Sequence, residues 1–250
     1  MHEISHSRQT ASGFEMTFRL LKSKSQMNKS RRKFLQSISL IAIAVSLPIK
    51  TSALNLFDKS VALLNKSLEK VLEIISSLRD EKSSIVKKVM DGKEYKFDPY
   101  FHYPIQGGIV DDDTKSRVFF HCHRENEFGH FHTFVEDENG ELVHLVLISM
   151  DEDGNPTALA TVNRWVTDDK YVKAEQLKIL FDEFKINPKL FKDERLLLFI
   201  KNILEGYKTE IFELFDKRDE WIKEYAFENY REPFEDREHE VLSSIEINLK

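Results

Sequence analysis

Two pairs of histidines, each with one residue between its members, constrain the fold more than any other feature of this 250-residue sequence. The pairs are His121 with His123 and His130 with His132. Because side chains two positions apart in a β-strand point to the same face of the sheet, each pair predicts a strand with both imidazoles on one side. An Asn and a Gly between the pairs favour a connection between antiparallel strands. The stretch therefore predicts a hairpin with four histidines on one face.

The register of this hairpin decides which imidazoles meet. With His123 opposite His130, the remaining two face each other, and opposite Cβ atoms are about 5 Å apart. Imidazole nitrogens bind zinc, copper and iron, so we expect a transition-metal site at His121, His123, His130 and His132. Four protein ligands would close a structural zinc site, whereas three would leave a position open for catalysis. In the alternative, the histidines bind one another, a carboxylate or a polar ligand without metal.

The loop between the two histidine pairs supplies two carboxylates that could take part in chemistry. Glu125 and Glu127 are candidates for a general base, for a metal ligand, or for an acceptor of the ring N–H of a metal-binding histidine. Their ordinary role would be a solvated loop surface. Cys122, the only cysteine, points to the other face of a regular strand, so we expect a small buried hydrophobic side chain there.

A second group of polar and aromatic side chains could line a pocket for a small polar or anionic ligand. Arginine next to tryptophan suits a carboxylate or a planar group, and an extra histidine in the aromatic segment 95–103 or in the third strand could join the site. The candidates are His102, Tyr103, His144, Asn163, Arg164 and Trp165. In the alternative to a metal protein, the chain is a non-enzymatic binding module without metal, which binds either such a ligand through these residues and the histidine pairs or another protein.

The N-terminal region resembles an export signal of the twin-arginine type. The motif is carried by Ser30-Arg-Arg-Lys-Phe-Leu-Gln36, followed by a moderately apolar run at 38–47 and by small residues at 51–53 that suit a cleavage site. Met27 would give a signal of ordinary length. The resemblance implies the twin-arginine machinery as a partner, a periplasmic or extracellular location, and no stable membrane insertion after cleavage.

Charge separates the same region from the rest of the chain. Residues 1–53 hold nine of the 37 basic and two of the 43 acidic side chains, which leaves 28 basic and 41 acidic ones at 54–250. This asymmetry predicts a separable basic segment at 1–53 and one domain at 54–250. The acidic character of the domain argues against nucleic acid as a partner.

The periodicity of apolar residues predicts a single α+β domain. Alternating or continuous apolar runs bounded by turn residues indicate an antiparallel meander of four or more strands, and apolar residues at three- and four-residue spacing indicate flanking helices. The strands are expected at 117–123, 130–136, 142–150 and 157–162, and the helices at 58–79, 83–90, 173–184 and 193–225, with a break near Gly206. The tail at 241–249 alternates enough for a strand, and 91–116 lacks periodicity.

The histidine region and the segments after it also resemble a known family. The likeness is carried by Phe120-His-Cys-His-Arg, Gly129-His-Phe-His-Thr-Phe134, Ile148-Ser-Met-Asp151 and Thr161-Val-Asn-Arg-Trp-Val-Thr167. These motifs are similar to those of a family of uncharacterised bacterial proteins known as a domain of unknown function. The resemblance implies one domain built around the histidine hairpin and no particular activity.

Overall fold

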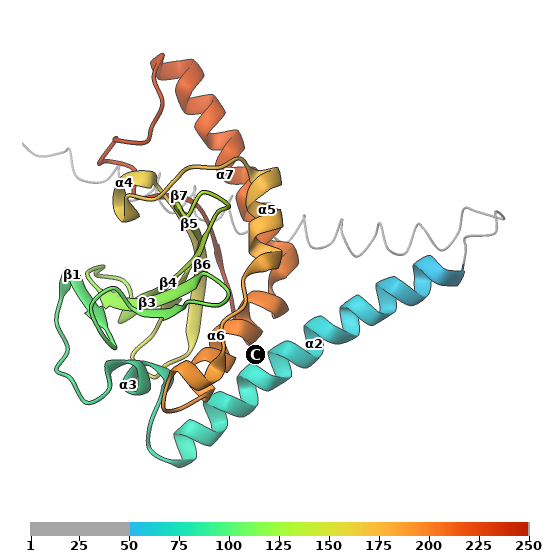
Figure 1. Cartoon of the computed structure of the whole chain (residues 1–250), viewed down its shortest axis with the longest axis vertical. Helices are drawn as coiled ribbons and strands as arrows, with labels where there is room; N and C mark the ends of the chain where they lie inside the picture. Colours follow the sequence, from blue (N-terminus) through green and yellow to red (C-terminus); the bar gives the residue numbers. More distant parts are fainter. Residues whose placement is uncertain (1–50, 250) are drawn as a thin grey trace, which may run out of the picture. The chain divides into compact units, whose positions relative to one another are not determined.

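The computed structural model describes residues 51–249, and seven strands between residues 98 and 246 form one antiparallel sheet (Figure 1). The compact unit that contains the sheet begins at Asp58. The predicted export motif at 30–36, the apolar run at 38–47 and the alternative start at Met27 lie outside the described residues. The expected cleavage residues 51–53 fall in the first turn of a helix, and cleavage there stays a prediction.

The sheet confirms the predicted meander and extends it at both edges. The strands are β1 (Asp98–Tyr103), β2 (Ile109–Asp111), β3 (Ser116–Cys122), β4 (Gly129–Glu136), β5 (Leu142–Met150), β6 (Pro156–Val162) and β7 (Val241–Glu246). Their order is β1-β3-β4-β5-β6-β7, and β2 also pairs with β3. β1 and β2 were missed because they are short, and their pattern is interrupted by prolines and glycines.

Helices cover one face of this sheet. The helices of the described residues are α2 (Thr51–Asp80), α3 (Ile85–Met90), α4 (Arg164–Thr167), α5 (Ala174–Glu183), the 3-10 turn η1 (Pro188–Leu190), α6 (Arg195–Gly206) and α7 (Lys208–Asn229). α7 packs on β6 and β7, and α5 packs on α7 and β4, so α5 and α7 lie side by side in Figure 1. Within residues 51–249 no helix has both the length and the apolarity that a bilayer crossing requires.

Two local features explain where the helices begin, end and meet. Ser84 caps α3 by accepting a hydrogen bond from the backbone N–H of Lys87. α6 ends at Gly206, as predicted, where a Cβ atom would lie 2.4 Å from Cδ2 of Leu68 on α2. Ser67, the neighbour of Leu68 on α2, donates a hydrogen bond to the carboxylate of Glu205 on α6. A glycine at 206 therefore allows α2 and α6 to approach closely.

Alternation along β3 separates a core face from the face that carries the histidines. Val118, Phe120 and Cys122 are buried in the main hydrophobic core against the helices. Phe119 and His121 point to the other face. Cys122 is fully buried, as expected, and burial raises the pKa of its thiol to about 12, so it is held as an unreactive thiol in the core.

The register between β3 and β4 differs by two residues from the one in which His123 faces His130. His121 lies opposite His130, and Phe120 lies opposite Phe131. A shift of two keeps every side chain on its predicted face, so packing selects between the two registers. In the observed register the Phe120 and Phe131 rings meet in the core at 4.8 Å between centroids. A Cβ atom at Gly129 would lie 2.4 Å from Cζ of Phe120, so the glycine lets the hairpin close over this ring.

Candidate metal centre

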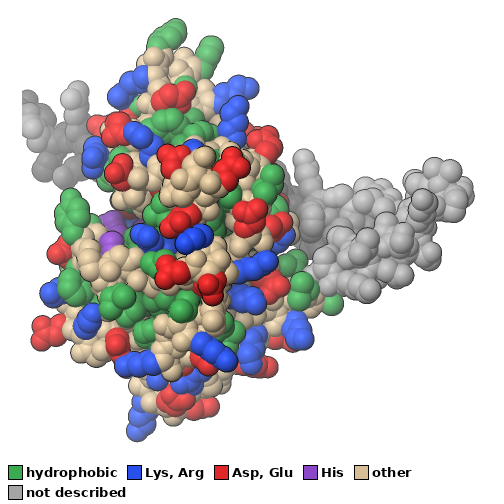
Figure 2. Space-filling view, viewed as in Figure 1, with side chains coloured by type: hydrophobic (Ala, Val, Ile, Leu, Met, Phe, Trp, Pro, Cys, Tyr) green, Lys and Arg blue, Asp and Glu red, His purple; other side chains and the backbone are tan. Residues whose placement is uncertain are grey.

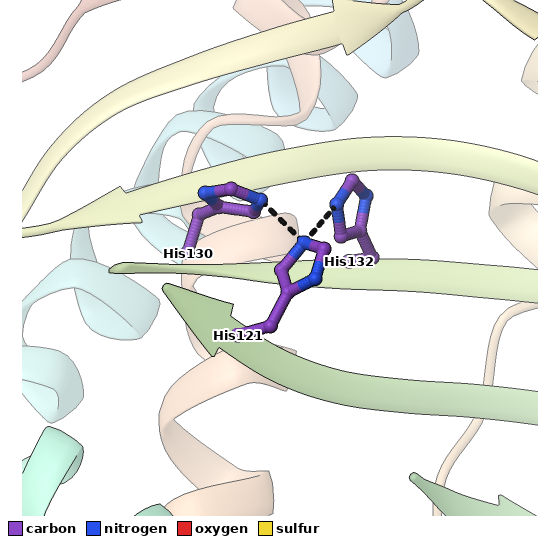
Figure 3. Close-up of side chains that lie close together, drawn as sticks. All are labelled: His121, His130 and His132. Atoms are coloured by element: carbon purple, nitrogen blue, oxygen red, sulfur yellow. Dashed lines mark hydrogen bonds between the residues drawn. The ribbon is translucent and has the colours of Figure 1, made fainter. Parts of the chain in front are cut away.

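Three buried histidines point their Nε2 atoms toward one another on the face opposite the helices (Figure 3). His121 comes from β3, and His130 and His132 come from β4. The Nε2 atom of His121 lies 2.6 Å from that of His130 and 3.0 Å from that of His132. His121 is 5% exposed, and the other two are fully buried. Nitrogens arranged in this way could hold a metal ion.

The Nδ1 atom of each of these rings has its own partner on the outer side. Nδ1 of His121 donates to the carbonyl oxygen of Pro99 at 2.9 Å. Nδ1 of His130 contacts the carboxylate of Glu127, and Nδ1 of His132 lies 2.9 Å from Nε2 of His144. Outer partners of this kind fix the tautomer and orientation of metal-binding histidines.

These partners determine which nitrogens carry hydrogen. A carbonyl and an ionised carboxylate can only accept, so His121 and His130 carry their hydrogens on Nδ1. A neutral imidazole has one N–H, so both Nε2 atoms present lone pairs to each other across 2.6 Å. Two lone pairs at this separation repel unless a proton or a metal cation lies between them.

Burial disfavours a proton between the two Nε2 atoms, because that proton would give the histidine pair a positive charge. Removal from water lowers the pKa of His121 to about 2 and lowers the pKa of His130 and His132 well below the usual histidine range. The neighbouring imidazoles lower the pKa values further, because a second positive charge in the cluster would be repelled. The three rings are therefore neutral near pH 7, the form in which histidine binds metals.

A bulge in β5 brings His144 to the cluster. Leu147 lies opposite His132 and His144 lies opposite Phe134, so two residues of β5 face the single Thr133 of β4. The bulge reverses the alternation, and residues 144 and 147 thus share the histidine face. The Thr133 hydroxyl stabilises it by donating to the carbonyl of Val146 and accepting from its N–H. His144, a candidate from the third strand, therefore lies beside the cluster.

His123 lies beside the three histidines but outside the set whose ligand atoms converge. β3 ends at Cys122, so His123 begins the loop. Its ring centroid lies 4.6 Å from that of His121 and 4.9 Å from that of His130. Its Nε2 atom is buried and has no hydrogen-bond partner among the described residues. Histidine atoms, in purple, are visible on the face of the molecule that Figure 2 shows.

The two loop glutamates have different positions. The Glu127 side chain is 6% exposed, contacts His130 and lies 3.7 Å from Nη1 of Arg124. Glu125 is exposed. The structure thus brings Glu127 to the histidines and leaves Glu125 on the surface of the loop.

The two aromatic-segment candidates lie on opposite sides of the sheet. His102 stacks on Phe119 with 4.0 Å between centroids, and its ring lies 5.6 Å from that of His121. Tyr103 is fully buried in the main core, where its hydroxyl donates to the carbonyl of Glu94. Only His102 therefore borders the histidine cluster.

The three remaining candidates fasten the C-terminal loop to the end of β6. Asn163 caps α4, and its side-chain amide donates to the carbonyls of Pro233 and His239. Trp165 donates to the His239 carbonyl at 3.2 Å, and Arg164 pairs with Glu235. Apart from Nε of Arg164, which is buried without a hydrogen-bond partner among the described residues, these groups are engaged within the protein, and their ligand-binding role stays a prediction.

Two neighbours of the cluster were missed from the sequence. Pro99 contributes only a backbone carbonyl, which no side-chain pattern reveals. Ser149 lies opposite His130 on β5, is 6% exposed, and its hydroxyl makes no hydrogen bond within residues 51–249. A serine in an apolar strand gives no signal until the register places it beside a histidine.

The fold and the cluster define an α+β protein whose antiparallel sheet carries a buried histidine site able to hold a metal ion. The chain belongs to the family described as a domain of unknown function, DUF6969, which matches residues 65–247. This assignment agrees with the family resemblance of the histidine motifs. No curated protein and no solved structure is a match for the chain.

Proposed function

We propose that this protein binds one divalent transition-metal ion through the Nε2 atoms of His121, His130 and His132. The observation that carries the proposal is the 2.6 Å approach of two Nε2 atoms whose Nδ1 hydrogens are committed to acceptors. A cation between the rings converts this repulsion into coordination. Zinc, copper and iron all accept imidazole ligands.

Loading requires only a small movement. A tetrahedral ion with nitrogen ligands at 2.0–2.1 Å separates those nitrogens by about 3.3 Å, so the Nε2 atoms of His121 and His130 would part by roughly 0.7 Å. The Nδ1 contacts to Pro99 and Glu127 hold both rings in the plane needed for this adjustment.

Three protein ligands leave a position on the ion for water or a substrate. The buried Nε2 of His123 and the hydroxyl of Ser149 lie on the same side of the sheet as the ligands and have no partner in residues 51–249. We infer a metalloenzyme that activates a bound water, with these groups next to the open position. If His123 becomes a fourth ligand, the site is closed and its role is structural.

Titration of the chelated protein with Co²⁺, followed by visible absorption, tests the proposal. We expect one ion per chain, and loss of tight binding in His121→Ala and His132→Ala, because each variant removes one of three ligands. His239→Gln is the matched control, since His239 lies at the C-terminal loop. Full binding by both ligand variants would overturn the proposal. If the site has three ligands, His123→Ala still binds the ion. If His123 is a fourth ligand, the same variant changes the visible spectrum of the bound Co²⁺.

We also propose that the protein is exported by the twin-arginine route and works in the periplasm or outside the cell. The support is the Arg31-Arg32 motif with its apolar run and small residues. Because that route carries folded proteins, the metal can be loaded before export. Replacement of Arg31 and Arg32 by lysine should retain the protein in the cytoplasm. Unchanged export of this variant would contradict the assignment.

A further inference from the structure

A cavity of about 560 Å³ lies at the edge of the sheet, and none of the three converging histidines lines it. It is bordered by β2, by the start of β3 and by the η1 turn, and its lining includes Ile105, Val110, Arg117, Leu190 and Phe191. Arg117 and His121 are four residues apart on β3, which separates them by about 13 Å. The volume suits a small organic molecule.

Arg117 brings an unpaired positive charge to this cavity. Its guanidinium makes no hydrogen bond and no ion pair within residues 51–249, and its Nε atom is buried. The cavity's other charged side chain, Asp91, is paired with Lys192. Arg117 is half-buried as a whole, and its Nε–H is withdrawn from water without an acceptor, which an anionic ligand would supply.

The walls around this charge are largely apolar. Phe191 is buried at one side, whereas Ile105 and Leu190 are 57% and 44% exposed. Large aliphatic side chains exposed at the rim of a cavity mark places where apolar groups bind. The cavity thus offers one cationic donor and an apolar surface beside it.

We propose that this cavity binds a small monocarboxylate with an aliphatic chain. The guanidinium of Arg117 pairs with the carboxylate through two parallel hydrogen bonds, and the chain packs on Ile105 and Leu190. The charge complementarity of Arg117 selects an acid over an alcohol or amine of the same length. The site is independent of the metal proposed above.

Calorimetric titration of the full chain with hexanoate, 1-hexanol and hexylamine tests this proposal. The His121→Ala variant, which lacks a ligand of the proposed metal site, is titrated in parallel. Hexanoate that binds to this variant is therefore not bound to a metal in the histidine cluster. We expect saturable hexanoate binding in both proteins, at least tenfold stronger than binding of hexanol and absent for hexylamine. Failure of hexanoate to bind, or equal binding of hexanol, would overturn the proposal and leave the metal site unaffected.

Two variants assign the binding to this cavity. Arg117→Gln should weaken hexanoate at least tenfold while its unfolding midpoint stays equal to or above that of the parent, since the lost charge has no partner. Leu190→Ser should weaken hexanoate and leave the preference for an acid intact. Arg164→Gln, at another arginine with a buried Nε, is the matched control. Parent-like hexanoate binding by Arg117→Gln would overturn the assignment.

Discussion

The Nε2 atoms of His121 and His130 lie 2.6 Å apart, and neither can donate to the other while both Nδ1 atoms hold their hydrogens. The antiparallel register sets this relationship, because it places the two residues directly opposite each other on β3 and β4. The pairing of Phe120 with Phe131 on the core face sets the register in turn. Core packing on one face therefore determines the ligand geometry on the other.

The carboxylate of Glu127 should determine how tightly the ion is held. Glu127→Gln replaces an ionised acceptor of the His130 N–H by a neutral amide, so His130 becomes a weaker ligand. We expect metal affinity to fall about 10–100-fold, measured by competition with a chelator of known affinity. The control is Glu125→Gln on the exposed part of the same loop. An equal effect of both changes would show that only loop charge matters.

His144 should act on the metal through His132. Its Nε2 atom is 2.9 Å from Nδ1 of His132. When Nε2 of His132 binds the metal, its hydrogen lies on Nδ1, so His144→Ala removes the acceptor for that hydrogen. We expect about a 10–100-fold loss of metal affinity with unchanged stoichiometry. Stoichiometry and affinity come from the same Co²⁺ titration. An unchanged affinity would show that the contact does not orient the ligand.

The bulge in β5 should depend on the Thr133 hydroxyl. Thr133→Val keeps the side-chain volume but leaves the N–H and carbonyl of Val146 without this partner. We expect a loss of about 1–3 kcal/mol in the free energy of unfolding, measured with urea, and weaker metal binding because His144 moves. Thr157→Val, on β6 and partly exposed, should change stability little. Equal stability of the two variants would contradict this role for Thr133.

The buried histidines should make the metal-free protein less stable in mild acid. Burial lowers the pKa of His121 to about 2 and that of His144 to about 3, whereas unfolded histidines titrate near 6.5. Between these values the unfolded chain binds more protons, so stability is complete above about pH 6.5 and is lost as the pH falls.

Urea unfolding of chelated protein at pH 8 and pH 5 measures this effect. Each histidine that stays neutral in the folded state contributes at most about 1.4 kcal/mol per pH unit below 6.5. The double variant His121→Gln/His144→Gln should show a smaller loss between the two pH values. The same loss in parent and variant would place the acid sensitivity in other groups.

Much of the fold could be predicted from the sequence because periodicity reports burial directly. The apolar alternation of β3 to β6 and the three- and four-residue spacing of the helices were sufficient for the α+β meander. β1 and β2 have no such period. Their pairing with β3 depends on long-range contacts, such as Tyr103 opposite Phe120.

The candidate site was predictable as a set of residue types and not as a geometry. The i, i+2 spacing places His130 and His132 on one face, but a register shift of two is invisible to that rule. The bulge opposite Thr133 depends on one hydroxyl, and the Pro99 contact on a carbonyl. Whether His123 or His144 joins the cluster was therefore open until the strands were placed.

Anomalous X-ray diffraction from crystals of the zinc-loaded protein, recorded at the zinc edge, tests the central claim most directly. It should show one ion per chain at about 2.0–2.1 Å from the Nε2 atoms of His121, His130 and His132, with Glu127 and Pro99 still on the outer nitrogens. An empty histidine cluster in crystals that carry zinc elsewhere, or an ion bound through Nδ1 atoms, would contradict the account.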